Sequence, residues 1–361
     1  MSQTSSSIGL AQMHHPDDLP TAADPISTSD QDDAIIRVAA YHRRDFNLAT
    51  LHRTTPLNSS ELSLFRSFNG NSGSTLGVLE VLPPEILTAI TLLLDLQSAL
   101  QFSHTNTRAK DLIAGIHEYR QTRDHALQCL WAAFTTRVAS TLCISAIHTA
   151  LVTRECSRCG AFGRFFSLLT ATQCCFHCLE RSPEFATISV TEVCRATYRT
   201  RAWLESVMPV LYTVPGIYGL AGTDCKRRRF IAAKAHCATR LDLEATLRIR
   251  FNTSQGIPEG RYMASCGIPY LDTATGVVEM GLSCKGCQVM LEEALFTNKR
   301  RSTAPYIRRD AVYSREGFLK HFGRCEGAKE LWDLSKGGTV PFDEPTFTKQ
   351  GGFIAKRTYE T

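Results

Sequence analysis

The sequence has no long apolar run: no uninterrupted stretch approaches the roughly 18 residues that indicate a membrane span, although 43% of its 361 residues are hydrophobic. Residues 1–10 also lack a basic region followed by an apolar run, so no secretory signal is predicted there. We therefore expect a soluble intracellular protein, cytoplasmic or nuclear, with no membrane partner. A chain of this length has room for two or three domains with sizeable cores.

The sequence also has only a small excess of positive over negative charge. The formal net charge is +5 and the sequence pI is near 8.5, which falls short of the strongly basic footprint of nucleic-acid-binding domains. One basic run, Lys226 to Arg229, is either a nuclear import signal, a phosphate contact or an ordinary solvated surface. Nucleic acid is therefore not the expected partner.

Cysteine, in contrast, is abundant. Fourteen cysteines without a secretory signal indicate metal ligands and reduced thiols rather than a disulfide framework. Cys156 and Cys159 are separated by fifteen residues from Cys175 and Cys178. Each CxxC directs two thiolates inward, and a hairpin between the pairs would complete a tetrahedron, which is a zinc-site spacing.

The ligand set of this first site leaves alternatives open. Cys174 could replace its neighbour, although Cys175 reproduces the two-residue spacing of Cys156 and Cys159. An iron–sulfur cluster uses the same thiolates, and four unliganded cysteines in a reduced core are a third interpretation. A nucleophilic Cys174 beside His177 would lack a third, orienting group in the sequence.

A second site is predicted from Cys284, Cys287, His321 and Cys325. His321 and Cys325 are four residues apart and would lie on one face of a helix capped by Ser314. The interval between the two ligand pairs requires an inserted loop, roughly 297–310. The alternative is a capped core helix beside unrelated cysteines.

Four protein ligands at each site describe closed, structural zinc, so the sequence predicts two structural Zn2+ ions and no catalytic residues. A RING-type ligase needs two interleaved sites, whereas more than a hundred residues separate Cys178 from Cys284. The remaining cysteines have no partner at ligand spacing and are expected to be small buried residues or unreactive thiols: Cys129, Cys143, Cys194, Cys225, Cys237 and Cys266.

A proline-led apolar stretch, Leu82-Pro83-Pro84-Glu85-Ile86-Leu87, predicts a helix start, because Pro and an acidic residue suit the first helical turn. Asp95 and Thr105 are predicted caps of two further short helices, the last ended by Gly115. Three helices this short cannot bury enough apolar surface to be stable alone, so this unit needs a partner or is an ordinary piece of a larger core.

This stretch, with Leu94-Asp95-Leu96-Gln97-Ser98-Ala99-Leu100 and Phe102 to Ala109, resembles the F-box, by which proteins dock onto a cullin-RING ubiquitin ligase. The cysteine-rich block after it resembles a segment found in filamentous-fungal F-box proteins, except that this chain has Ala171 near the place of a further cysteine. The resemblance covers about 79–335. It implies a substrate-receptor subunit that binds the ligase adaptor through Leu82, Pro83, Ile86, Leu87, Leu94 and Leu96.

The expected fold is mainly α with small β-hairpins: an F-box three-helix unit, then small zinc-stabilised α+β modules, after a disordered N-terminus with a transient helix at 32–41. The expected parts are a disordered region (1–76), the F-box (77–120), linking helices (121–153), a four-cysteine module (154–181), a helical and basic linker (182–260), a three-cysteine, one-histidine module (261–336) and a flexible tail (337–361). The target protein is not identified by any residue, and the alternative function is a zinc-finger nucleic-acid-binding protein.

Overall fold

The computed structural model describes residues 29–53, 75–240, 258–296 and 304–352. In these residues helices predominate, and the strands, two to four residues long, pair antiparallel in five small sheets. The predicted class, mainly α with small β-hairpins, is confirmed at this level. No helix in the described ranges is long and apolar enough to cross a membrane.

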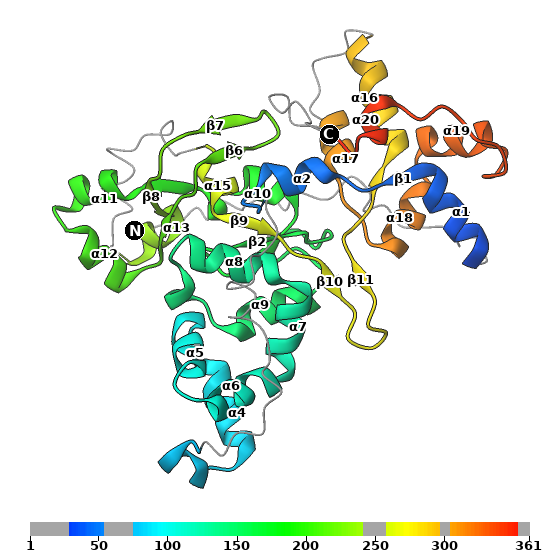
Figure 1. The fold of residues 1–361 in the computed structure, drawn as a ribbon. Coiled ribbons are helices and arrows are strands. Elements are labelled where there is room, and N and C mark those ends of the chain that lie inside the picture. The colour runs from blue at the N-terminus through cyan, green and yellow to red at the C-terminus, as the bar shows by residue number, and fades with distance from the viewer. Residues whose placement is uncertain (1–28, 54–74, 241–257, 297–303, 353–361) are drawn as a thin grey trace, which may run out of the picture.

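Six consecutive helices form the lower part of the molecule in Figure 1. They are α4 (Pro84–Leu93), α5 (Leu96–Ser103), α6 (Thr107–Gly115), α7 (His117–His125), α8 (Leu127–Thr135) and α9 (Ile144–Val152), preceded by the 3-10 helix η1 (Gly77–Val81), with η2 (Ala139–Thr141) between α8 and α9.

The sequence predicted the starts of the first two helices correctly. Helix α4 begins at Pro84, and Asp95 caps α5 by accepting the Ser98 N–H at 2.9 Å. The predicted cap of the third helix was wrong. Asn106, not Thr105, accepts a free N–H in the first turn of α6, from Ala109 at 2.8 Å. An amide oxygen is as good a cap as a hydroxyl, and Asn106 is the residue that immediately precedes the helix.

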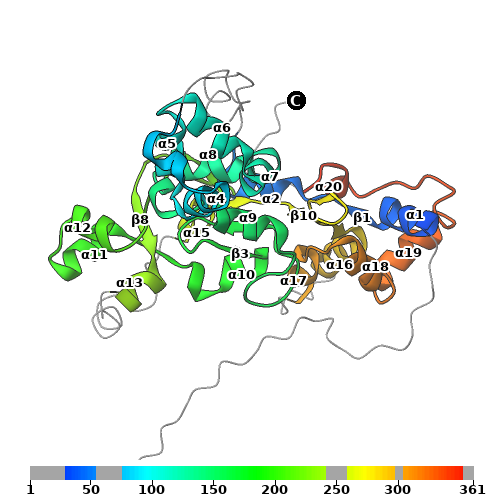
Figure 2. The ribbon, with the colours of Figure 1, turned by 90° about the horizontal axis from the view of Figure 1, so that it is seen from below.

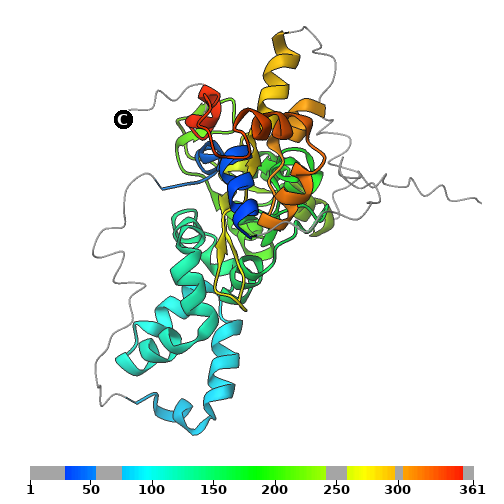
Figure 3. The same ribbon diagram turned by 90° about the vertical axis from the view of Figure 1, so that its right-hand side faces the viewer.

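The core beneath these helices is shared with the centre of the molecule. Leu96, Ile113 and Ile144 belong to one buried cluster that also contains Phe166 and Ile268 from the centre of the molecule. Helices α4 to α6 nevertheless project away from that centre, as Figures 1 and 3 show. The three helices are therefore anchored at one end and exposed at the other.

The centre is built on a sheet of order β3-β2-β9. Its strands are β2 (Phe165–Ser167), β3 (Thr172–Cys174) and β9 (Ser265–Gly267), flanked by α10 (Phe176–Arg181), η3 (Pro183–Phe185) and α15 (Gly260–Met263). A further hairpin follows in the chain, formed by β10 (Tyr270–Leu271) and β11 (Val278–Glu279).

Residues 182–240, predicted as a linker, instead form a folded lobe. Its elements are β4 (Thr187–Ser189), α11 (Val190–Thr197), α12 (Arg201–Val207), β5 (Val210–Tyr212), β6 (Gly216–Tyr218), β7 (Thr223–Cys225), β8 (Phe230–Ala233) and α13 (Lys234–Arg240). A separate small core, including Ile188, Val193 and Leu204, stabilises it. The lobe lies on the left of Figure 1.

The C-terminal module lies on the opposite side, on the right of Figures 1 and 2. It contains β12 (Ser283–Cys284), α16 (Lys285–Phe296), α17 (Ala304–Asp310), α18 (Arg315–Phe322), α19 (Glu326–Leu334) and α20 (Thr346–Lys349). Part of the predicted 297–310 loop is thus helix α17, and residues 297–303 lie outside the described residues.

The N-terminal segment corrects the prediction of disorder across 1–76. Helix α1 (Ser29–Ala39), strand β1 (Ala40–Tyr41) and helix α2 (Arg44–Ala49) are packed into the molecule. Strand β1 pairs with β12, and α1 lies against α18 and α19. Ile35, Ala39 and Ala40 are buried because the distant C-terminal module covers them, whereas Phe46 and Leu51 are buried in the cores at the centre of the molecule. Residues 1–28 and 54–74 lie outside the described residues.

The tail is also ordered as far as residue 352, contrary to the prediction of flexibility from 337. Helix α20 buries Thr348, and the Gly351 carbonyl accepts the Arg44 N–H at 2.7 Å. This hydrogen bond joins the tail to the N-terminal segment, which sequence spacing could not reveal. Residues 353–361 lie outside the described residues.

Candidate metal centres

The first cluster consists of Cys156, Cys159, Cys175 and Cys178. Their sulfur atoms all lie within 4.8 Å of one another, and the Cys159 and Cys175 Sγ atoms are 3.6 Å apart. Three of the four residues are buried and Cys159 is exposed. The structure thus brings together the four thiols that the spacing singled out.

Local backbone geometry directs these thiols inward. The turn after Cys156 closes through its N–H, which donates to the Ala161 carbonyl at 2.6 Å. The hairpin of β2 and β3 then returns the chain to Cys175, which caps α10 by accepting the Cys178 N–H on its sulfur at 3.4 Å. Helix α10 therefore begins at the cluster and carries Cys178 in its first turn.

The structure distinguishes Cys175 from its neighbour Cys174. Cys174 ends β3, is fully buried and is not part of the cluster. Successive residues of a strand point to opposite faces, so only one of the two cysteines can face the other ligands.

The second cluster consists of Cys284, Cys287, His321 and Cys325, all buried. The Cys325 sulfur lies 3.7 Å from that of Cys284 and 3.8 Å from that of Cys287, and the Cys287 sulfur lies 3.4 Å from His321 Nε2. The Tyr313 ring stacks on the imidazole with centroids 4.6 Å apart. This contact orients the histidine toward the three sulfur atoms.

The elements around this cluster differ in part from the prediction. Ser314 caps α18 as expected, accepting the Gly317 N–H at 3.1 Å. The helix ends at Phe322, however, and Cys325 lies in the turn before α19. A hydrogen bond from the Cys325 N–H to the His321 carbonyl at 3.0 Å continues the helical spacing, so the two side chains still meet.

Strand β1 is the part of this site that sequence reasoning missed. Ala40 is the antiparallel partner of Cys284, and Tyr41 that of Ser283. The first ligand is therefore held on a strand completed by residues more than two hundred positions earlier. The only sequence signal that the segment containing β1 is folded is the apolar pattern of Ile35, Ile36 and Val38.

Thiol–thiol contacts shift the acidity of both clusters. Hydrogen bonds with Cys159 and Cys175 hold the pKa of Cys156 far below its ordinary value. In the second cluster, hydrogen bonds with Cys284 and Cys287 lower the pKa of Cys325 strongly, while that with Cys284 raises the pKa of Cys287. In each cluster at least one thiolate is thus stabilised by neighbouring thiols. A metal cation bound at the same place would replace the protons that these thiols share.

The donor spacing fits one ion at each centre. A tetrahedron with metal–sulfur bonds of about 2.3 Å has edges of about 3.8 Å, and the sulfur–sulfur distances of 3.6 to 3.8 Å agree with this. Both groups can therefore hold a metal ion, with four protein donors and no position left open in a tetrahedral site. Such a centre can join chain segments, but it offers no coordination site to a substrate.

The cysteines outside the clusters are not all isolated. Cys129 of α8 and Cys266 of β9 are both fully buried, and the Cys266 thiol donates to the Cys129 sulfur at 3.3 Å. This pair could not be predicted from the sequence because the two residues are 137 positions apart. With only two donors it is a core contact between the helices and the central sheet, and all fourteen cysteines are free thiols.

The residues predicted to bind the adaptor divide into two groups. Pro83 and Ile86 are exposed, and Leu82 and Leu94 are half-buried. Leu87 and Leu96 are only 8% and 4% exposed, because α4 packs on α6 and α9, and the Leu96 N–H donates to the Leu142 carbonyl at 2.8 Å. These two leucines stabilise the helices and are not available for docking.

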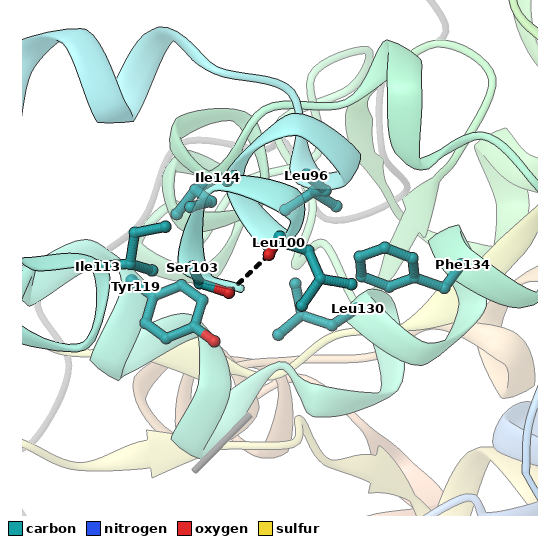
Figure 4. Close-up of a pocket in the computed structure, with 9 residues that line it drawn as sticks. Leu96, Leu100, Ser103, Ile113, Tyr119, Leu130, Phe134 and Ile144 are labelled. Carbon is teal, nitrogen blue, oxygen red and sulfur yellow. Dashed lines mark hydrogen bonds between the residues drawn. The ribbon is translucent and has the colours of Figure 1, made fainter. Parts of the chain in front are cut away.

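A small cavity lies beneath the same helices (Figure 4). Its volume of about 20 Å³ has room for about one water molecule, whereas small-molecule sites enclose roughly 300 to 1,000 Å³. The Ser103 hydroxyl in its wall already donates to the Leu100 carbonyl at 2.6 Å. The cavity is a packing gap in the helical core. It is lined mainly by apolar side chains, including Leu96, Ile113, Tyr119, Leu130, Phe134 and Ile144.

No known protein family, curated protein or solved structure matches the chain.

Proposed function

We propose that this protein is a non-catalytic substrate receptor of a cullin-RING ubiquitin ligase, which docks onto the ligase adaptor through η1 and α4. The observation that supports this most directly is a set of exposed apolar side chains on the projecting end of the helical unit. We call this set the docking face: Val78, Val81, Pro83, Ile86, Ile90 and Leu93.

The docking face follows helical geometry. Ile86, Ile90 and Leu93 are spaced i, i+4 and i+7 and so lie along one side of α4, where Leu93 is 83% exposed. Val78 and Val81, 88% and 84% exposed, are three residues apart on the 3-10 helix, so they too share a side. Contiguous exposed apolar residues on a folded protein mark an interaction site.

The docking face revises the sequence prediction. Pro83 and Ile86 remain from the six predicted contacts, the half-buried Leu82 and Leu94 are left out, and Ile90, Leu93 and the two valines of η1 are added. Leu87 and Leu96 become structural residues of the unit. The order of motif residues from Leu82 to Ala109 remains the basis of the F-box assignment.

We further propose that zinc occupies both metal centres. Donor atoms within 4.8 Å of one another leave no room for a cluster of several irons, and three thiolates with one imidazole is a common structural zinc set. Binding of structural zinc contributes on the order of 10 to 16 kcal/mol in finger peptides. The two ions would hold a rigid platform on which a target is presented.

Affinity purification from a eukaryotic cell lysate, followed by mass spectrometry, tests the docking assignment. The test variant is Ile86→Ser with Ile90→Ser and Leu93→Ser, because these side chains are exposed and their loss should leave the fold intact. The matched control, Val277→Ser with Leu334→Ser, removes exposed apolar side chains elsewhere, which are 54% and 66% exposed.

We expect the adaptor and cullin subunits to be recovered with the wild-type chain and with the control, and to be lost with the docking variant. Absence of these subunits from the wild-type sample would refute the proposal. Equal recovery by all three proteins would place the docking site elsewhere in the chain.

A further inference from the structure

The fourteen cysteines differ in their access to solvent. All of them lie in the described residues, and among them Cys159 is the only exposed one. Cys143, Cys194 and Cys225 are half-buried, and the other ten are buried. A thiol is oxidised only if the oxidant reaches its sulfur. Cys159 is therefore the cysteine that a small oxidant dissolved in water meets first.

The exposure of Cys159 follows from the turn that carries it. Residues 157–160 are all exposed. The turn closes through Gly160, whose N–H donates to the Cys156 carbonyl at 3.1 Å and whose φ of 74° suits glycine. A Cβ added at Gly160 would meet no atom within 4 Å, so this side of the turn is open. One ligand of the first centre thus lies outside the core that holds the other three.

A second sulfur lies in contact with that of Cys159. The Cys175 Sγ atom is 3.6 Å away, although Cys175 itself is only 8% exposed. A bond between two sulfur atoms is about 2.05 Å long, so the two sulfurs must approach each other by about 1.5 Å to form one. Because Cys159 is exposed, its side chain has room to rotate toward Cys175. The exposed thiol is thus placed beside a partner for a disulfide.

The second centre differs from the first in both respects. The exposed fractions of its four ligands, Cys284, Cys287, His321 and Cys325, lie between 0% and 7%. Ile35 of α1 belongs to the same buried cluster as the three cysteines, so the N-terminal segment helps to cover them. One donor is an imidazole, which cannot form a disulfide. The two centres have the same number of donors but should therefore react differently with an oxidant.

We propose that Cys159 is the site at which hydrogen peroxide oxidises this protein, and that the product, a disulfide between Cys159 and Cys175, displaces the metal ion of the first centre. The displacement rests on the zinc occupancy proposed above, whereas formation of the disulfide does not. Neither step requires the ligase adaptor or a target protein.

The reaction has two steps. The Cys159 thiolate attacks one oxygen of the peroxide, the O–O bond breaks, and a sulfenic acid forms while hydroxide leaves. The Cys175 thiolate then attacks the sulfenic sulfur, the S–S bond forms, and a second hydroxide leaves. With two protons from water, two thiolates and one peroxide give one disulfide and two water molecules. The two sulfurs lose two electrons, and the peroxide oxygens gain them.

The disulfide removes two of the four donors of the first centre. The remaining pair, Cys156 and Cys178, cannot close a tetrahedron around the ion. Loss of the ion should loosen α10, which begins at the centre. Phe176 of this helix stacks on Phe46 of α2 with ring centroids 4.4 Å apart, and the two helices lie side by side in Figure 1. The disulfide keeps the turn joined to α10, so reduction can bring the four donors together again.

The test uses the purified full-length chain and hydrogen peroxide. In the variant Cys159→His the first centre keeps four donors, three thiolates and one imidazole as in the second centre, but loses its exposed thiol. The matched control, Cys225→Ser, removes a half-buried thiol outside both centres. Elemental analysis counts the zinc before peroxide is added, and circular dichroism establishes that each variant is folded. A chromophoric chelator then measures released zinc, and peptide mapping without reduction locates the disulfides.

We expect the wild-type chain and the control to release one zinc ion and to form the Cys159–Cys175 disulfide. The peroxide concentration required should be roughly tenfold or more below that which releases the second ion, because the second set of thiols is buried. At the lower concentration Cys159→His should keep both ions. A thiol reductant with added zinc should restore the first centre of the wild-type chain.

Release of both ions together, earlier loss from the second centre, a first disulfide other than Cys159–Cys175, or equal release by Cys159→His would each overturn the proposal. If Cys159→His binds no zinc when purified, the disulfide map of the wild-type chain still decides the oxidation site. Zinc-free wild-type protein would overturn the zinc assignment and the release step together. Adaptor recovery from the same samples reports separately on the docking assignment, which depends on η1 and α4.

Discussion

Gly286, inside the CxxC of the second cluster, lies directly against the backbone of Gly327 at the start of α19. A Cβ added at Gly327 would lie 2.8 Å from the Gly286 carbonyl oxygen, and one added at Gly286 would overlap the backbone of Gly327 and Ala328. Backbone atoms cannot move aside as a flexible side chain can. This contact brings α16, which carries Cys287, against the helix that follows Cys325, so it helps to set the distance between the ligands.

Replacing Gly286 should therefore damage the second metal centre. For Gly286→Ala we expect a loss of about 1 to 3 kcal/mol in the free energy of unfolding, as is typical of overpacking, together with a lower metal content. Gly323→Ala is the control in the same module, because its Cβ would meet its nearest neighbour at 3.5 Å, an ordinary contact. Urea unfolding and elemental analysis would measure both effects. Equal values for the two variants would show that α16 and α19 can separate without consequence.

Both clusters of candidate metal ligands could be predicted from the sequence because a CxxC is a local signal. The two cysteines of each pair meet through a turn that needs no distant partner, as the N–H···S contact of Cys287 with Cys284 at 3.4 Å shows. The helix starts at Pro84 and after Asp95 were predictable for the same reason. In each case the residues that determine the local structure lie within four positions of the turn or helix start that they form.

The features that the sequence did not reveal depend on contacts between residues that are far apart in the chain. The apolar residues of segment 29–53 are scattered among charged and polar ones, yet its strand pairs with β12 and its helix packs on α19. Leu87 and Leu96 belonged to the predicted docking set because the three helices alone would expose them. Helices α7 to α9 complete the core and bury Leu96, which no local pattern in α4 or α5 could indicate.

The identity of the fourth ligand in the first centre can be tested by counting metal ions. Cys175→Ala should reduce the bound metal from two ions per chain toward one, because three donors no longer close the tetrahedron. Cys174→Ala should keep both ions, since this thiol is buried outside the cluster. Elemental analysis of the purified proteins gives the count. The reverse result would assign the ligand to Cys174.

Metal removal should have a consequence far from the ligands in sequence. Structural zinc contributes about 10 to 16 kcal/mol in isolated fingers, which is comparable to the total stability of a domain, about 5 to 15 kcal/mol. Because β1 pairs with the strand that carries Cys284, a strong chelator should release Ile35 to Tyr41 together with the C-terminal module.

Hydrogen exchange read by mass spectrometry can follow this release. We expect amides of residues 35–41 to lose protection at the same chelator concentration as those of α18, while α8 and α9, which carry no ligand, lose it later or to a smaller extent. Retained protection of residues 35–41 after complete metal loss would show that packing alone holds the N-terminal segment.

The N-terminal segment is also held by a buried ion pair. Arg43 donates to both carboxylate oxygens of Asp45, at 2.7 and 2.6 Å, and to Asp310 at 3.0 Å, and its guanidinium lies 4.1 Å from the centroid of the Phe46 ring. Arg43 and Asp45 are each only 1% exposed. The arginine cannot lose its charge, so each carboxylate is needed to compensate for its burial.

Asp45→Asn should therefore be strongly destabilising. Removing one partner of a buried pair leaves an uncompensated charge and typically costs about 3 to 5 kcal/mol, partly offset here by Asp310. The control is Asp124→Asn, which breaks the pair with Arg123, where Asp124 is 51% exposed; such surface pairs contribute about 0 to 1 kcal/mol. Denaturant unfolding monitored by circular dichroism compares the two. If Asp45→Asn unfolds no more readily than Asp124→Asn, the segment 29–53 does not depend on this ion pair for its attachment, and its apolar contacts with the C-terminal module must hold it.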